Sequence, residues 1–170
     1  KINLTLPGDR LQVSLLPVPV KLESAWLTGA IAHGLAAKVE MALSTINTQF
    51  KGYENYSFNN PASDFTSSST EVFAGNLDDA GRAAFSMNLP AAADAPGMLQ
   101  ANITCRVFER GGDASIFTQS IPFSPFSAYV GVALNNDSQN QILETDREHH
   151  FDVVTLSPDG RPVPRENVDY

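Results

Sequence analysis

Cys105 is the only cysteine of the chain and the first candidate for nucleophilic chemistry. A cysteine nucleophile needs a partner base, usually histidine, that takes up its proton. Cys105, however, alternates with Ile103 and Val107 on one side of a strand-like run, where a free cysteine behaves as a small buried hydrophobic residue. The sequence also lacks the G-x-S-x-G pattern of a serine hydrolase, and its acidic residues are scattered rather than paired. The pattern favours a structural cysteine and predicts no catalytic residue.

Histidines close to an aspartate are the next candidates, in this case for a metal site. His149 and His150 precede Asp152, and His33 is distant in sequence beside Gly34. Adjacent residues of a strand point to opposite faces, so two neighbouring histidines rarely bind one ion. No H-E-x-x-H spacing occurs. We expect these histidines to face solvent or to cap turns, and we predict no metal ligand and no cofactor-binding residue.

Acidic residues beside a glycine occur in Asp78-Asp79-Ala80-Gly81 and in Asp159-Gly160. A calcium loop distributes several oxygen ligands along one segment, whereas these short sequences are typical of tight turns. We therefore predict turns rather than calcium sites.

Aromatic side chains are concentrated in the polar stretch 45–70. Tyr53, Tyr56, Phe58 and Phe65 lie there among Asn, Ser and Thr residues. Such residues either stack on a sugar or anchor a long surface excursion to the core. No cluster of carboxylates or amides accompanies them at fixed spacing, so we expect them to fold back onto the body of the domain.

The strand that contains Cys105 shows the clearest periodicity in the chain. Residues 99–107 alternate apolar and polar side chains, as in a strand with one buried face. Gly111-Gly112 predicts a turn, and 115–121 predicts a second strand at hairpin spacing.

Two further hairpins are expected from the same kind of pattern. Segments 2–6 and 11–15 alternate around Pro7-Gly8, and segments 71–77 and 82–89 flank a turn that ends in glycine.

The remaining strands before residue 122 are less regular. Pro17 and Pro19 indicate an edge or a linker rather than a central strand. Segment 22–27 is expected to be a strand, and 35–43 is interpreted as a strand in preference to a short helix. About seven strands result, which suits an all-β antiparallel sandwich of immunoglobulin-like size.

The pattern restarts after Pro125. Segments 129–134 and 148–156 are predicted strands, joined by a polar loop over 135–141. These residues are too few to fill a sandwich of their own. We expect one sandwich over 1–122, followed over 123–170 by the opening strands of a second, truncated sandwich.

Composition sets limits on function. The chain has 170 residues, 42% of them hydrophobic, which is enough for a packed core. A net charge of −8 argues against binding nucleic acid or anionic lipid through bulk electrostatics. The sequence has no apolar run of about 18 residues, so no membrane insertion is predicted. Because alternation begins at the first residues without a signal-peptide pattern, we interpret the sequence as part of a longer protein.

Several ordered motifs resemble one family. The "WLxGAxA" pattern occurs at 26–32 and the "FxGYxxYxF" pattern at 50–58. Both resemble macroglobulin-like domains of bacterial alpha-2-macroglobulins, as do the closing-strand residues at 97–99, 106–109 and 111–113. Residues 129–132, 150–154 and 159–163 are similar to the entry into the following domain.

The resemblance implies a scaffold role in a large endopeptidase inhibitor. In this family, strings of macroglobulin-like sandwiches surround a bait segment, and cleavage of the bait leads to capture of the protease. The expected partners are the neighbouring macroglobulin-like domains of the same chain and, through the full-length protein, target proteases. The expected location is the periplasm or another exported site, with a possible lipid anchor at the full-length N-terminus. The domain here resembles the one before the bait-bearing domain.

The resemblance also raises a specific question about Cys105, because many family members carry a thioester formed at Cys-Gly-Glu-Gln. Here the context is Thr-Cys-Arg-Val. The thioester motif is absent at this position, so a structural cysteine remains the prediction.

Two rival functions stay open on the sequence alone. A carbohydrate-binding or adhesin module would use the aromatic residues of 53–65 on its surface. An enzyme would have a deep pocket lined by His150 or by clustered carboxylates.

Overall fold

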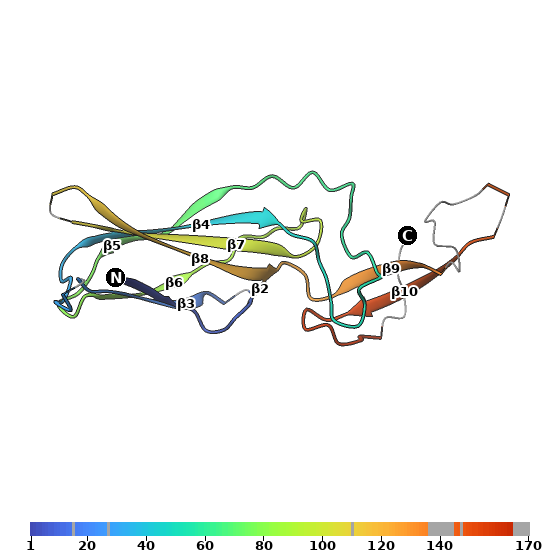
Figure 1. Cartoon of the computed structure of the whole chain (residues 1–170), viewed down its shortest axis with the longest axis horizontal. Coiled ribbons are helices and arrows are strands. Elements are labelled where there is room, and N and C mark those ends of the chain that lie inside the picture. Colours follow the sequence, from blue (N-terminus) through green and yellow to red (C-terminus); the bar gives the residue numbers. More distant parts are fainter. Residues whose placement is uncertain (15, 27, 110, 136–144, 147, 165–170) are drawn as a thin grey trace.

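The computed structural model describes residues 1–14, 16–26, 28–109, 111–135, 145–146 and 148–164. Within these ranges the chain forms strands and no helix, which confirms the all-β prediction (Figure 1). This part of the chain therefore contains no helix of the length and hydrophobicity needed to cross a membrane. The strands are β1 (Ile2–Thr5), β2 (Leu11–Gln12), β3 (Val18–Ser24), β4 (Ala36–Thr45), β5 (Ser69–Asn76), β6 (Arg82–Met87), β7 (Leu99–Phe108), β8 (Ala114–Ser124), β9 (Tyr129–Asn135) and β10 (His150–Leu156).

The larger sheet has the strand order β2-β8-β7-β4-β5. β7 lies at its centre and pairs antiparallel with β4 and with β8. Alternate residues of β7, from Leu99 to Val107, are buried, as the period-two pattern predicts. The predicted hairpin between 99–107 and 115–121 is thus confirmed, and β4 confirms the strand rather than the helix for 35–43.

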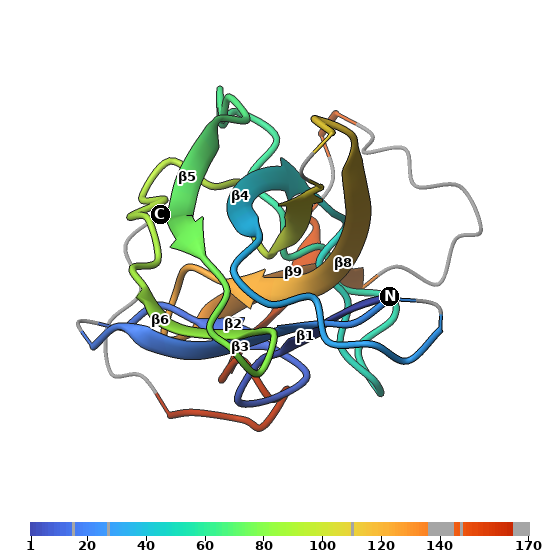
Figure 2. The same ribbon diagram turned by 90° about the vertical axis from the view of Figure 1, so that its left-hand side faces the viewer.

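The smaller sheet has the order β1-β3-β6, with both pairs antiparallel. Figure 2 shows it lying across the open side of the curved larger sheet. The facing sides share one hydrophobic core that includes Leu22, Val39, Met87, Ile103 and Phe123. Full burial of such a side chain contributes about 1.5–3 kcal/mol. The sandwich is held together by this core.

The other two predicted hairpins are wrong, and for one reason. β1 pairs with β3 while β2 pairs with β8, so the Pro7-Gly8 turn carries the chain from the smaller sheet to the larger one. β5 pairs with β4 and β6 with β3, so the 78–81 turn carries the chain back. Alternation identifies the buried face of a strand, but it does not specify which sheet the strand joins. In this fold, each of these two turns carries the chain from the sheet on one side of the core to the sheet on the other side.

Pro19 lies in the central strand of the smaller sheet, which contradicts the edge or linker predicted from Pro17 and Pro19. At Pro19, β3 pairs only with β6, because pairing with β1 begins at Lys21. Proline is tolerated there because the strand is locally an edge. The strand predicted at 22–27 therefore begins earlier and ends at Ser24, and the last residue of that prediction lies outside the described residues.

β9 and β10 form a separate two-stranded antiparallel sheet at the other end of the molecule from the 78–81 turn (Figure 1). They confirm the strands predicted at 129–134 and 148–156. One face carries Tyr129 and Leu156, which belong to a second hydrophobic cluster. The opposite face exposes apolar side chains to solvent, namely Val130, Val132, Phe151 and Val153. Most of the polar loop predicted over 135–141 lies outside the described residues.

Candidate functional site

Cys105 lies at the centre of β7, opposite Val39 of β4 and Phe117 of β8, and it is fully buried. Burial raises the pKa of its thiol to about 11. The reactive form of cysteine is the thiolate, so at neutral pH this side chain is a protonated, inaccessible core residue. The structure places it where the sequence predicted a structural cysteine.

We expect Cys105 to resist thiol reagents in the folded protein. Because the thiol is buried and its pKa is about 11, 5,5′-dithiobis(2-nitrobenzoic acid) at pH 8 should label less than about one hundredth of the protein in the time that urea-unfolded protein is fully labelled, in line with the low fraction of open states. Rapid labelling without denaturant would contradict this burial.

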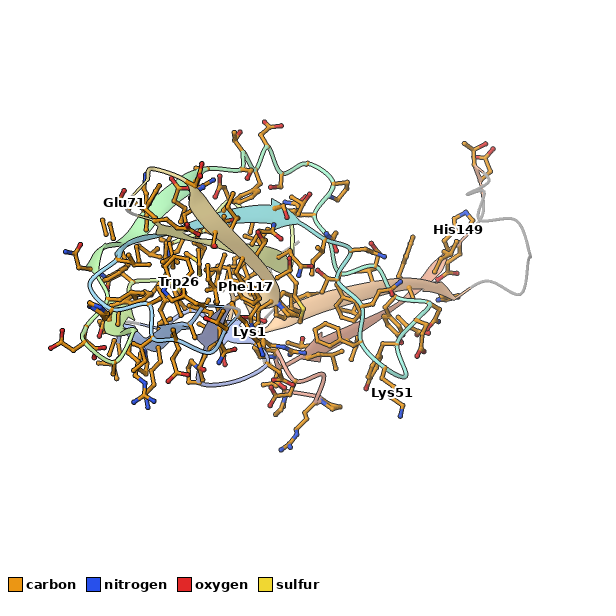
Figure 3. All side chains as sticks on the ribbon, turned by 60° about the vertical axis from the view of Figure 1, so that its left-hand side comes forward. Lys1, Trp26, Lys51, Glu71, Phe117 and His149 are labelled. Atoms are coloured by element: carbon orange, nitrogen blue, oxygen red, sulfur yellow. The ribbon has the colours of Figure 1, made fainter. Side chains whose placement is uncertain are left out.

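The three histidines belong to no group of three potential metal ligands in the part of the chain that the structure describes. His33 is exposed beside the Gly34 turn, and His150 is exposed at the start of β10 with Asp152 two residues further on. Figure 3 shows His149 near the outer end of β10, far from the labelled residues of the sandwich. Within the described ranges, no group of three His, Cys, Asp or Glu side chains is placed to hold a metal ion.

The aspartates beside glycines form turns. Asp78 Oδ1 accepts hydrogen bonds from the backbone N–H groups of Ala80 (2.9 Å) and Arg82 (2.8 Å). The second turn closes through the N–H of Gly160, which donates to the Ser157 carbonyl at 2.8 Å. Turn chemistry thus accounts for both motifs.

The aromatic loop, residues 46–60, packs its rings against a different surface from the one predicted from the sequence. Phe50 and Phe58 are buried with ring centroids 4.8 Å apart, and Phe50 also lies 5.6 Å from the ring of Tyr129. These rings, with the half-buried Tyr53 and Tyr56, pack on the inner face of the β9–β10 sheet rather than back on the sandwich. Among the predicted anchors, only Phe65 packs against the sandwich core.

A buried polar cluster fixes the two ends of the aromatic loop to the start of β7. Thr48 is almost fully buried, and its Oγ1 accepts a hydrogen bond from the Met98 N–H at 2.7 Å. Asn59 Oδ1 accepts from the Thr48 N–H at 2.7 Å, and Asn59 Nδ2 donates to the Ile46 carbonyl at 3.0 Å. A Cβ on Gly97 would lie 2.3 Å from Thr48 Oγ1, so only glycine permits this approach.

We expect Thr48→Val to reduce the free energy of unfolding by about 1–3 kcal/mol, because it leaves the buried Met98 N–H without an acceptor. Urea unfolding followed by circular dichroism measures the change. Thr48→Ser keeps the oxygen and should recover most of the loss. The surface variant Thr118→Val should stay within about 0.5 kcal/mol of the parent. Equal losses for Thr48→Val and Thr118→Val would show that the hydrogen bond has no such role.

Two glycines let the aromatic rings contact the second sheet. A Cβ on Gly131 of β9 would lie 2.3 Å from the Phe58 ring, and one on Gly160 would lie 3.0 Å from the Phe50 ring. Each ring therefore packs directly on backbone. The Phe58 ring packs on strand β9, where such a use of glycine is common, and the Phe50 ring packs on the turn that follows β10. Arg10, from the β1–β2 connection, adds a third link by donating to the Pro158 carbonyl.

Two buried hydroxyls lie where the chain passes from one sheet to the other. Ser124 ends β8 and Tyr129 begins β9, and neither hydroxyl has a hydrogen-bond partner among the described residues. Burial raises the pKa of the Tyr129 phenol. The neighbouring Ser124 hydroxyl, the Phe126 backbone and the charge of Arg10 partly oppose that shift.

We call these contacts the joint: the polar cluster around Thr48, the packing of Phe50 and Phe58 on the second sheet, and the link from Arg10 to Pro158. Its components come from four parts of the chain that are distant in sequence. Its chemistry is packing and hydrogen bonding, so what it can do is hold the second sheet at a fixed position relative to the sandwich. The sequence signals that could have revealed it are the glycines at 97 and 131, which require close contacts.

Comparison with known proteins agrees with the fold. The sequence profile described as "Bacterial Alpha-2-macroglobulin MG5 domain" matches residues 1–116. No curated protein matches the sequence.

Solved structures similar to this one include Salmonella alpha-2-macroglobulin reacted with methylamine, at 19% identity and a TM-score of 0.62 over 95% of this chain and 11% of that chain. Escherichia coli alpha-2-macroglobulin in its native conformation has 19% identity and a TM-score of 0.60, over 94% of this chain and 11% of that chain. The same protein activated by porcine elastase has 20% identity and a TM-score of 0.61, over 94% of this chain and 14% of that chain.

These identities establish the shared fold, and the chain spans only 11–14% of the length of those structures. The profile, in contrast, covers more than half of the chain, in the segment that forms the sandwich. The chain therefore belongs to the bacterial alpha-2-macroglobulin MG5 domain family.

Proposed function

We propose that this chain is a scaffold segment of a bacterial alpha-2-macroglobulin-like endopeptidase inhibitor, and that it has no catalytic, cofactor-binding or metal-binding residue of its own. Its partners are then the neighbouring domains of the same protein and, through the full-length protein, the proteases that it traps. The structures of Escherichia coli alpha-2-macroglobulin activated by porcine elastase and by trypsin support this proposal, because proteases act on that similar protein.

The observation that carries the proposal is the joint. It fixes the second sheet to the sandwich through buried aromatic rings and a buried threonine hydroxyl, rather than through a flexible linker. A rigid joint transmits a change of position from one domain to the next, which a trap that rearranges after cleavage requires.

We further propose the domain division of residues 1–122 as one macroglobulin-like sandwich and 123–170 as the opening strands of the next, bait-bearing one. The exposed outer face of β9–β10 supports this division. Phe151 is 51% exposed and Val153 is 58% exposed, side by side with apolar residues of β9. A sheet face of this kind is normally covered by a second layer of secondary structure.

Phe151→Ala tests the division. In the present chain the substitution should change the free energy of unfolding by no more than about 0.5 kcal/mol, because the ring faces solvent. In the full-length protein it should be destabilising by about 2 kcal/mol or more, because the ring would then be covered. A neutral effect in both chains would refute the division.

Protease capture tests the function. The full-length protein should retain trypsin after bait cleavage, measured as co-elution on size exclusion. Phe58→Ala should reduce the retained fraction without changing the rate of bait cleavage. Thr118→Val, a surface change on the sandwich, is the matched control. Hydrogen exchange of the β9 amides shows whether Phe58→Ala loosens the joint. If it does and the retained fraction of trypsin is unchanged, the scaffold role is ruled out.

We propose a periplasmic or exported location for the full-length protein, either free or held by a lipid anchor at its N-terminus. Cell fractionation, with metabolic labelling by palmitate, distinguishes these possibilities from a cytoplasmic location.

The carbohydrate-binding alternative has no comparable support. Phe50 and Phe58 are buried, and the Tyr53 and Tyr56 rings pack against each other at 5.5 Å.

A further inference from the structure

The outer edge of β8 pairs with no described strand along most of its length, although β1 lies close to β8. From Ala114 to Pro122, β8 pairs only with β7 among the described strands, and β2 joins it only at Phe123 and Ser124. Figure 2 shows β8 at one margin of the curved sheet. The backbone N–H and C=O groups on this margin are the kind of groups that an added strand binds.

This edge lacks the protection that the opposite edge of the same sheet has. No charged residue occurs anywhere in β8, and its outward-facing Ile116 is 64% exposed. On the opposite edge, β5 carries Glu71 in an ion pair with Lys38 at 3.1 Å, and its register with β4 is irregular. Charges and irregular register are common means of preventing strand addition. β8 has neither along the open segment.

A hollow of about 350 Å³ lies at the start of this edge. Its lining combines apolar residues, Trp26, Leu35 and Val107, with the charged residues Lys1 and Glu109 and with Ser115 of β8. Ser115 is paired with Val107, so the two side chains lie on the same, inner side of the sheet. A strand added to β8 would direct alternate side chains to that inner side.

Trp26 makes this hollow a suitable anchor site. Trp26 is 40% exposed. Its backbone is held by two hydrogen bonds, from the Trp26 N–H to the Ala30 carbonyl (2.8 Å) and from the Gly29 N–H to the Trp26 carbonyl (2.9 Å). Trp26, Lys1 and Ser115 of β8 all line this hollow. A partly exposed tryptophan beside apolar residues such as Leu35 and Val107 is a common anchor in protein interfaces.

We propose that the β8 edge and this hollow bind an extended, uncharged segment from another domain of the full-length protein. The segment adds to β8 as a strand and places one large apolar side chain in the hollow. The segment must be extended, because only a strand can form hydrogen bonds with the whole row of backbone N–H and C=O groups along the edge of β8. A source within the same protein is favoured because similar full-length structures are far longer than this chain, and a tethered segment has a high effective concentration. The inference rests on the proposed scaffold role, since it names one of the domain contacts.

A peptide titration tests the binding chemistry on the present chain. The probe is acetyl-Thr-Val-Thr-Phe-Thr-Val-Thr-amide, and Trp26 is the only tryptophan, so its fluorescence reports on the hollow. We expect a saturable change. Replacing the central Phe by Ala, or N-methylating alternate amides, should weaken binding at least tenfold.

Ser115→Phe should abolish binding by filling the hollow. Thr118→Phe, on the outer face of the same strand, should leave binding within about twofold, because its side chain does not reach the hollow. Equal binding by the N-methylated peptide, or by Ser115→Phe, would overturn the proposal.

Hydrogen exchange tests the source of the segment. In the full-length protein, amides of residues 114–121 should exchange at least tenfold more slowly than in the present chain. If exchange in β8 is the same in both, no segment of the protein occupies the edge and the proposal fails. Protease capture by the full-length protein is measured separately, so failure here leaves the scaffold role to its own test.

Discussion

Phe58→Ala is expected to weaken the attachment of the β9–β10 sheet by about 3–5 kcal/mol, the range measured for removal of a buried phenylalanine. Phe58 is 7% exposed and contacts Phe50 and the backbone of Gly131. Its removal leaves a cavity at the joint that the paired strands cannot easily fill. Urea unfolding followed by near-UV circular dichroism measures the loss of stability. Hydrogen exchange of the β9 amides shows whether the loss is local to the second sheet.

Phe151→Ala is the matched control, because it also removes a phenylalanine side chain, but from the exposed face of the β9–β10 sheet, whose inner face Phe58 covers. In the present chain it should change stability by no more than about 0.5 kcal/mol. If the two substitutions had equal effects, the joint would not be the structure that holds the second sheet.

Gly81→Ala is expected to reduce the free energy of unfolding by about 2–4 kcal/mol. Gly81 has φ of +73°, a conformation that costs an L-residue about 1–2 kcal/mol. Its added Cβ would also lie 2.6 Å from the Ser24 carbonyl oxygen, a backbone atom that cannot move without disturbing the smaller sheet. Thermal unfolding should show a lower midpoint, by several degrees per kcal/mol.

Gly112→Ala separates the two contributions. Gly112 has φ of +95° and open space around it, so the substitution adds backbone strain without a clash. Its expected effect is about 1–2 kcal/mol. A Gly81→Ala protein no less stable than Gly112→Ala would mean that the 78–81 turn is not packed under the Ser24 backbone as described.

The strands could be predicted from the sequence because their signal is local. Alternation from Leu99 to Val107 depends only on neighbouring residues, and β7 and β8 appear where the pattern places them. Sheet membership is not local. The 78–81 turn has all the features of a hairpin turn, yet the strands on either side complete different sheets, because the hydrophobic face of each must meet the core from the opposite side.

The joint was not predicted from the sequence, for a related reason. Thr48 and Met98 are 50 residues apart, and a buried threonine has no pattern that distinguishes it from a surface one. The aromatic residues of the loop were visible in the sequence, but their packing partners, Tyr129 and Leu156, follow much later. Only the family resemblance, which rests on ordered motifs, reached beyond local pattern, and the domain profile confirms it.

The aromatic loop belongs by sequence to the sandwich and by packing to the second sheet. A cut of the chain between Ser124 and Pro125 would therefore not separate two independent units. It would remove Tyr129 and Leu156, which cover Phe50, Phe58 and Met98, and these three side chains would then be exposed on the surface of the first piece. The sandwich and the β9–β10 sheet are thus interlocked rather than joined by a linker, so an insertion or a recombination point between Ser124 and Pro125 would still divide a core.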